Sequence, residues 1–197
     1  MHRAGETPAS TVLGRDFPRR AIRDKRTPMS DSSVLWAPWR MAYVGAPKEP
    51  GCIFCDKPGA ADQKAALVLA RPAHALVMLN RFPYANGHVM VAPRRHTAEL
   101  SALPPAEHVA LGEVLRRSQT LLQEFFHPDG MNIGMNLGRA AGAGITEHLH
   151  WHLVPRWVGD TNFMPLIGEV RCIPEHLEAL WDRLRPVFAT LDASQPT

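Results

Sequence analysis

The sequence lacks the features of membrane-spanning, secreted and disulfide-rich proteins. Its 197 residues contain no apolar run of about 18 residues, so no membrane-spanning helix is expected. The N-terminus has no hydrophobic region of the kind found in secretory signals. Only three cysteines occur, Cys52, Cys55 and Cys172. An odd count with a C-x-x-C pair fits a reducing compartment better than a disulfide framework, so we expect a cytoplasmic protein.

The predicted folded part also lacks an excess of either charge. The formal net charge is +3, but residues 1–28 hold seven of the 22 basic and three of the 19 acidic side chains. The rest of the chain carries 15 basic and 16 acidic residues and is nearly neutral. We therefore expect no nucleic-acid partner.

Residues 1–33 show no helical or strand periodicity, and we interpret them as a disordered basic extension. One interpretation is a non-functional segment upstream of the biological start, for which Met29 is a candidate. Another is a basic arm that contacts anions. The whole chain is 45% hydrophobic, enough for a core. We predict one domain at 34–190 and a disordered tail at 191–197.

The domain shows alternating and amphipathic segments. Asn86-Gly87 is a strong hairpin turn signal, Thr97 is a candidate helix cap, and Pro186 is a candidate break in the last helix. Because helices and strands are segregated along the chain, the pattern predicts an α+β fold with an antiparallel sheet. The predicted strands are 67–70, 74–79, 88–93 and 131–137, and the predicted helices are 104–126 and 174–188.

Residues 144–157, G-I-T-E-H-L-H-W-H-L-V-P-R-W, hold three of the ten histidines. His148, His150 and His152 are two residues apart, which is the period of a strand. We predict a strand that places the three imidazoles on one face and the intervening apolar residues on the core. The small-residue loop at 138–144 precedes it, and its glycines let backbone N–H groups approach an anion. No G-K-[ST] follows, so this is not a Walker A loop.

An anion-binding loop beside histidines suits phosphate chemistry. A neutral imidazole is a competent nucleophile near pH 7. Two alternatives remain: the three histidines bind one catalytic metal, or they are structural groups with satisfied hydrogen bonds. Cys52 and Cys55 have the spacing of half a structural zinc site, but also that of a redox pair.

The segment H-L-H-W-H-L-V-P-R resembles the signature of the histidine triad (HIT) family. The resemblance runs from about Leu35 to about Pro165. L-N-R-F-P-Y-A-N-G-H-V-M-V is similar to the family's nucleoside-binding hairpin. L-W-A-P-W-R, G-C-I-F-C and D-T-N-F-M-P resemble the branch that contains bacterial diadenosine tetraphosphate phosphorylases. The resemblance implies a HIT-like α+β fold, an antiparallel sheet with a long helix and a C-terminal helix, and a homodimer.

The resemblance also implies roles for individual residues. His150 matches the nucleophile that attacks the α-phosphorus and forms a nucleotidyl-histidine intermediate. His152 matches the residue that stabilises charge on the phosphate. Asn80 matches a ribose contact, and Asn136 a polar group near the leaving group. Further substrate-binding positions, in the phosphate loop, are Gly142 and Gly144.

In family members with a C-x-x-C pair, the first histidine of the triad binds structural zinc. Mapped onto this sequence, the implied ligands are Cys52, Cys55, His96 and His148. No organic cofactor is implied.

The implied activity is cleavage of diadenosine tetraphosphate, most simply phosphorolysis to ATP and ADP. One alternative is hydrolysis of dinucleoside polyphosphates or nucleoside phosphoramidates. An alternative of another class is a nucleotide-binding regulatory module with little catalysis. A metallohydrolase whose catalytic metal is held by the three triad histidines is the remaining possibility.

Overall fold

A computed structural model describes residues 51–160 and 175–193 of the chain. The chain divides into two units, residues 1–35 and 36–197, and all described residues belong to the second. The predicted N-terminal extension, the L-W-A-P-W-R and D-T-N-F-M-P segments and Cys172 lie outside the described residues. None of the helices within the described ranges is both long and apolar enough to cross a membrane.

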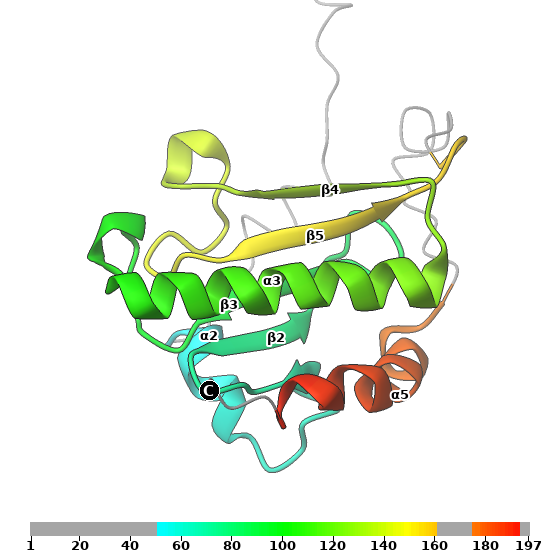
Figure 1. Cartoon of the computed structure of the whole chain (residues 1–197), viewed down its shortest axis with the longest axis horizontal. Coiled ribbons are helices and arrows are strands. Elements are labelled where there is room, and N and C mark those ends of the chain that lie inside the picture. The colour runs from blue at the N-terminus through cyan, green and yellow to red at the C-terminus, as the bar shows by residue number, and fades with distance from the viewer. Residues whose placement is uncertain (1–50, 161–174, 194–197) are drawn as a thin grey trace, which may run out of the picture. The chain divides into compact units, whose positions relative to one another are not determined.

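The described residues form an α+β fold, as the segregated pattern predicts (Figure 1). The strands are β1 Val68–Ala70, β2 Ala75–Leu79, β3 Val89–Pro93, β4 Gly130–Met135 and β5 Trp151–Arg156. The α-helices are α2 Ile53–Asp56, α3 Pro105–Phe126 and α5 Leu177–Phe188. Short 3-10 helices cover η2 Lys57–Gly59, η3 Leu100–Ala102, η4 Arg139–Ala141 and η5 Ala189–Leu191.

The sheet has the strand order β1-β2-β3-β5-β4, and every pair is antiparallel. A connection with Gly87 at φ +75° joins β2 and β3, and the backbone N–H of Asn80 donates to the His88 carbonyl across it (2.9 Å). The predicted hairpin is therefore confirmed. The histidine strand, β5, lies between β3 and β4 and is thus an interior strand.

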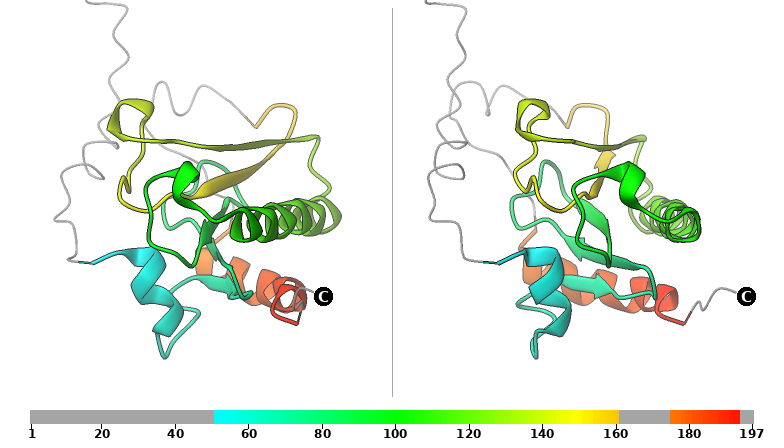
Figure 2. Two further views of the ribbon diagram at one scale, coloured as in Figure 1. Left: turned by 60° about the vertical axis from the view of Figure 1, so that its left-hand side comes forward. Right: turned by 90° about the vertical axis from the view of Figure 1, so that its left-hand side faces the viewer.

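Alternate residues of the strands divide between two hydrophobic clusters, one on each face of the sheet. On β2, Val77 and Leu79 belong to the cluster that includes residues of α3 and α5, whereas Leu76 and Met78 belong to the cluster that includes Phe54 of α2. Figure 2 shows α2 and α3 on opposite sides of the sheet. Full burial of each such side chain contributes about 1.5–3 kcal/mol, so this alternation fixes which face each strand residue occupies.

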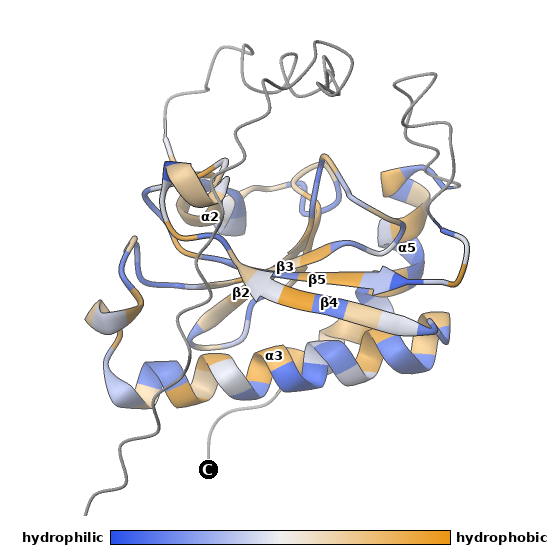
Figure 3. Cartoon of the chain, turned by 90° about the horizontal axis from the view of Figure 1, so that it is seen from above, coloured by the Kyte–Doolittle hydropathy of each residue, from blue (hydrophilic) through white to orange (hydrophobic). Residues whose placement is uncertain are grey.

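The long helix α3 begins with Pro105 in its first turn and ends at His127, which adopts the left-handed conformation (φ 46°). Its fully buried residues, Leu111, Ser118 and Leu122, lie on one face at helical spacing. Figure 3 shows the matching alternation of hydrophobic and hydrophilic bands along α3. The helix predicted at 104–126 is confirmed.

The helix α5 covers the β1 edge of the sheet. The Trp181 indole Nε1–H donates to the Val68 carbonyl (2.7 Å), and the Arg185 guanidinium donates to the Leu69 carbonyl (2.8 Å). These side chains donate hydrogen bonds to backbone carbonyls of β1 that could otherwise accept hydrogen bonds from another strand. The other edge strand of the described sheet is β4, which pairs only with β5.

The strand predicted through all three histidines is wrong in its first half, because β5 begins at Trp151. The neighbouring strand β3 ends at Pro93, which has no N–H to donate, and its last pair with β5 is Val91 with Trp151. Before that point the Leu149 N–H donates to the Thr97 carbonyl instead (2.7 Å). His148 and His150 therefore precede the strand.

Three smaller expectations also need correction. Pro186 does not break α5, which continues to Phe188, a fully buried residue. The Thr97 hydroxyl accepts from the Glu99 N–H (3.1 Å) ahead of η3 and caps no α-helix. Leu191 is buried and the Asp192 carboxylate binds Arg185 (3.0 Å), so these two residues of the predicted tail pack against the domain.

Candidate active site and metal centre

The three triad histidines gather on the α2 side of the sheet, although only His152 lies in a strand. The ring centroids of His150 and His152 are 4.8 Å apart. Leu149 and Leu153 point to the opposite side, where they join the α3–α5 cluster with almost no exposure. The alternation predicted from the period of two is therefore confirmed.

The imidazole of His150 is held in one tautomer. Its Nδ1 lies 2.9 Å from the His148 backbone carbonyl, which can only accept, so Nδ1 carries the proton and Nε2 keeps its lone pair. Burial lowers the pKa of His150, an effect that the hydrogen bond to His148 opposes. His150 is consequently a neutral imidazole near pH 7, and within residues 51–160 and 175–193 its nucleophilic Nε2 has no hydrogen-bond partner.

The proton of His152 is fixed through a fourth histidine, His88. The Tyr84 backbone N–H donates to His88 Nδ1 (3.1 Å), so the His88 proton is on Nε2. That Nε2–H donates to His152 Nδ1 (3.0 Å), which leaves His152 with its own proton on Nε2. Burial, together with the nearby His150, lowers the pKa of His152 to about 4. His152 is therefore a neutral hydrogen-bond donor at Nε2.

His88 was not among the site residues predicted from the sequence. His88 was only the first residue of the strand predicted at 88–93. The side chain is 1% exposed, and one signal was available: a polar residue at the start of the apolar run H-V-M-V. A buried imidazole there needs partners for both nitrogens, and His152 provides one of them.

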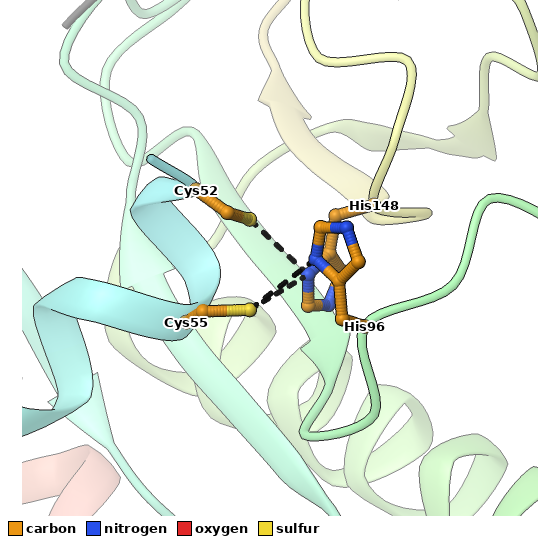
Figure 4. A group of neighbouring side chains, drawn as sticks. All are labelled: Cys52, Cys55, His96 and His148. Atoms are coloured by element: carbon orange, nitrogen blue, oxygen red, sulfur yellow. Dashed lines mark hydrogen bonds between the residues drawn. The ribbon is translucent and has the colours of Figure 1, made fainter. Parts of the chain in front are cut away.

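Cys52, Cys55, His96 and His148 form the second centre. Their four candidate ligand atoms all lie within 4.8 Å of one another. The two thiols come from the α2 turn, His96 from the segment after β3 and His148 from the segment before β5 (Figure 4). The structure thus brings together the four residues that sequence resemblance selected.

The distances in this centre fit a tetrahedral ion. The Cys52 Sγ lies 3.3 Å from His148 Nδ1, and the Cys55 Sγ lies 3.3 Å from His96 Nδ1 and 3.6 Å from His148 Nδ1. Zinc bonds of about 2.3 Å to sulfur and 2.0–2.1 Å to nitrogen imply S···N edges of roughly 3.5 Å. His148 donates from Nε2 to the Pro93 carbonyl (2.9 Å), which turns its Nδ1 lone pair toward the thiols.

Without a cation, the Cys55 thiol of this centre is held protonated. Partial desolvation, followed by the hydrogen bond with Cys52, raises the pKa of Cys55 to about 11. A metal ion binds the thiolate, so metal binding must release a proton here. The four side chains therefore fit a zinc-type ion.

Of the remaining predicted substrate residues, Asn80 lies beside His88, and the other three lie in or next to the loop between β4 and β5. Asn80 accepts the Phe82 N–H through Oδ1 (2.9 Å), and its Nδ2 lies 3.4 Å from His88 Nδ1. Asn136 follows the last residue of β4 and is half-buried. Gly142 has φ +87° and donates its N–H to the Arg139 carbonyl (3.0 Å), so this N–H closes the loop. Gly144 is exposed in the segment that leads to His148.

An α+β domain with a five-stranded antiparallel sheet and three alternating histidines, one of them with an available Nε2, defines the histidine triad class. The HIT domain family model matches residues 61–158. Over 171 residues the chain is 37% identical to the AP-4-A phosphorylase of Mycobacterium tuberculosis, covering 82% of this chain and 85% of that protein. The chain belongs to the HIT family.

Solved structures show the same fold. A Zn-bound histidine triad family protein from Mycobacterium smegmatis superposes with a TM-score of 0.56 at 32% identity, covering 74% of this chain and 98% of that one. A hypothetical histidine triad nucleotide-binding protein from Sulfolobus tokodaii gives a TM-score of 0.55 at 23% identity, covering 70% of this chain and 91% of that one. The second likeness concerns the fold alone.

Proposed function

We propose that this protein is a nucleotidyl transferase that cleaves diadenosine tetraphosphate through a nucleotidyl-His150 intermediate, with inorganic phosphate as the acceptor. The observation that carries the proposal is the tautomer of His150, whose Nδ1–H is bonded to the His148 carbonyl and whose Nε2 is thereby available to attack. The 37% identity to an AP-4-A phosphorylase supports this choice of substrate and acceptor.

In the first step, His150 Nε2 attacks the α-phosphorus of one adenosine. The P–N bond forms, the P–O bond to the bridging oxygen breaks, and ATP leaves. The imidazole then carries phosphorus on Nε2 and a proton on Nδ1, so it is cationic, and the His148 carbonyl lies 2.9 Å from that nitrogen to stabilise the charge. In the second step, a phosphate oxygen attacks the same phosphorus, ADP forms and His150 is released as a neutral imidazole.

His152 is the proposed donor to the phosphate in both steps. Because His88 donates to its Nδ1, the Nε2–H of His152 is available for a phosphate oxygen that gains charge in the transition state. Asn80 is the proposed ribose contact and Asn136 the proposed contact near the leaving oxygen. Since the Gly142 N–H is used within the loop, we propose that Gly142 shapes the phosphate loop and that Gly144 lies beside the phosphate.

We propose that the four-residue centre binds structural zinc. All four positions would be protein ligands, which leaves no open position for substrate or water and fits a structural ion rather than a catalytic one. The likeness to the Zn-bound protein from Mycobacterium smegmatis supports this assignment. Bound zinc would supply a rigid link between α2 and the segment that leads to His150.

The geometry favours this function over a metallohydrolase that uses the triad as its metal cage. Among the described residues, His148 faces the cysteines through Nδ1, whereas His150 and His152 belong to no metal-ligand group. A hydrolase that uses water as the acceptor shares the same first step and remains the second candidate. A regulatory module with little catalysis is the third, but it gives no role to the available Nε2 of His150.

We also propose a homodimer formed through the β4 edge and a cytoplasmic location. The edge strand exposes an apolar side chain, Ile133, at 44%. A cytoplasmic location agrees with paired thiols that serve as ligands rather than as a disulfide.

Phosphate dependence tests the proposed reaction. The protein is incubated with diadenosine tetraphosphate in phosphate-free buffer and with added phosphate, and the nucleotides are separated by chromatography. We expect ATP and ADP only when phosphate is present. Turnover that is independent of phosphate and yields AMP with ATP would replace the phosphorylase by a hydrolase. Tight binding with no product under either condition would favour the regulatory module.

A further inference from the structure

Phe54 lies between Cys52 and Cys55 in the sequence, yet its side chain faces the triad. It is the buried residue of α2, with 1% exposure, whereas the flanking thiols point to the metal centre. Its ring centroid is 4.9 Å from that of His150, at an interplanar angle of 35°, and 5.1 Å from that of His148. One phenyl ring therefore contacts both the nucleophile and a metal ligand.

The same ring is packed against the sheet. Phe54 belongs to the hydrophobic cluster that contains Met78 of β2 and Met90 of β3. The sheet and the imidazoles together enclose it. A side chain held in this way leaves its neighbours little room to rotate, because protein interiors are close-packed.

A closely packed neighbour can restrict the orientation of the His150 ring. Its hydrogen bond to the His148 carbonyl selects the tautomer, but the torsion about the Cβ–Cγ bond of histidine is intrinsically broad. A flat ring against the imidazole restricts that torsion and so aims the Nε2 lone pair. An error of about 1 Å in the position of a reacting atom can cost roughly 100-fold in rate.

We infer that Phe54 is a positioning residue for His150, held against it by the two cysteines on either side. The inference rests on the proposed function, in which His150 is the nucleophile. It gives the C-I-F-C turn two tasks: the thiols bind the ion, and the residue between them orients the catalytic imidazole. The effect of the metal on catalysis then passes through Phe54 as well as through His148.

The test compares two variants that each remove one buried phenyl ring. Phe54→Leu removes the ring beside His150, and Phe188→Leu removes a fully buried ring in the α3–α5 cluster on the opposite face. Both proteins are measured for kcat and KM with diadenosine tetraphosphate and phosphate, and for metal content. The His150 Nδ1–H proton signal is followed by NMR, because it reports the hydrogen bond to His148 without any turnover.

We expect Phe54→Leu to lower kcat by about tenfold or more while KM changes by less than about threefold. Its His150 Nδ1–H signal should broaden or disappear through faster exchange, with metal content equal to that of the wild type. Phe188→Leu should keep kcat within about twofold and retain the signal, because its loss of packing lies on the opposite face of the sheet.

Equal behaviour of the two variants in both kcat and the NMR signal would overturn the inference. If Phe54→Leu does not give folded protein, Phe54→Met, which keeps more of the buried volume, is compared with Phe188→Met in the same way. The signal also separates this inference from the proposed function. Wild-type protein that shows the Nδ1–H signal but no turnover rejects the function, whereas turnover with equal variants rejects the role of Phe54.

Discussion

At the scale of single residues, the positions of two protons explain why equally spaced histidines differ in chemistry. The His148 carbonyl places the proton of His150 on Nδ1, and His88 places that of His152 on Nε2. One ring thus offers a lone pair and its neighbour offers a donor, which are the two groups that attack on phosphorus requires. The triad motif supplies the rings, but their hydrogen-bond partners determine their roles.

The role of His88 can be tested with a pair of amide substitutions. His88→Asn should lower kcat by about 10–100-fold, because no donor then reaches His152 Nδ1 and its tautomer is no longer fixed. The kcat of His88→Gln should fall less, because its amide lies nearer the position of the imidazole Nε2. Steady-state kinetics with diadenosine tetraphosphate and phosphate would measure both. Equal loss in the two variants would show that His88 acts through packing alone.

The pH dependence of the first step follows from the burial of His150. The neutral imidazole is the reactive form, and burial lowers the pKa of His150 below its usual value near 6.5. The rate of adenylyl transfer should therefore hold through pH 6.5 and fall only as the pH drops through the lowered pKa. Single-turnover rates of adenylyl transfer, measured without phosphate at a series of pH values, would show where the rate falls. Metal content would be followed at each pH. A midpoint at or above pH 6.5 would contradict the assignment.

At the scale of elements, α2 is a helix of only four residues that carries Phe54 and Cys55, with Cys52 as its N-cap residue. A helix this short has little intrinsic stability, so its position depends on side-chain contacts. The cluster of Cys52, Cys55, His96 and His148 supplies such contacts from three segments, since His96 and His148 follow different strands. A metal ion bound there would link α2 to the chain that leads to His150.

Metal removal should therefore destabilise the domain as well as slow catalysis. We expect about one metal ion per chain by elemental analysis, and a melting temperature lowered by roughly 10 °C after chelation. The doubly substituted Cys52→Ser/Cys55→Ser protein is the matched control, and chelator should not lower its melting temperature further. If metal-free wild-type protein had an unchanged melting temperature, the metal ion would have no structural role.

Local patterns predicted most elements because their signals are local. The turn signal of the hairpin, Asn86-Gly87, and the apolar stripe of α3 each come from residues that are close together in the sequence. The start of β5 could not be predicted in this way, because it depends on where another strand, β3, ends at Pro93. His88 was not predicted as a site residue for the same reason, since its partner His152 is 64 residues away in the sequence. The metal residues were grouped only through family resemblance, because sequence spacing alone left a redox pair open.

At the scale of the whole domain, the two edges of the sheet differ. The β1 edge is covered by Trp181 and Arg185 of α5, whereas β4 forms the other edge within the described chain. An edge strand with an exposed apolar side chain invites pairing with a second copy. The closed edge restricts such pairing to β4, which agrees with the proposed homodimer.

A charge on β4 should weaken that dimer. Ile133→Lys places a charge on the edge strand, and we expect the mass measured by light scattering to shift from dimer toward monomer. Val158→Lys, at an exposed position (90%) beyond the end of β5, is the control and should leave the mass unchanged. A wild-type protein that is monomeric at micromolar concentration would contradict the proposal.

The central claim is that His150 becomes covalently nucleotidylated, and trapping the adduct tests it most directly. Protein mixed with diadenosine tetraphosphate without phosphate is quenched in alkali, which preserves phosphoramidates, and digested for mass spectrometry. We predict an adenylyl group on the peptide that contains His150, its loss on addition of phosphate with formation of ADP, and its absence in His150→Ala. Turnover with no adduct, or an adduct that persists in His150→Ala, would contradict the account.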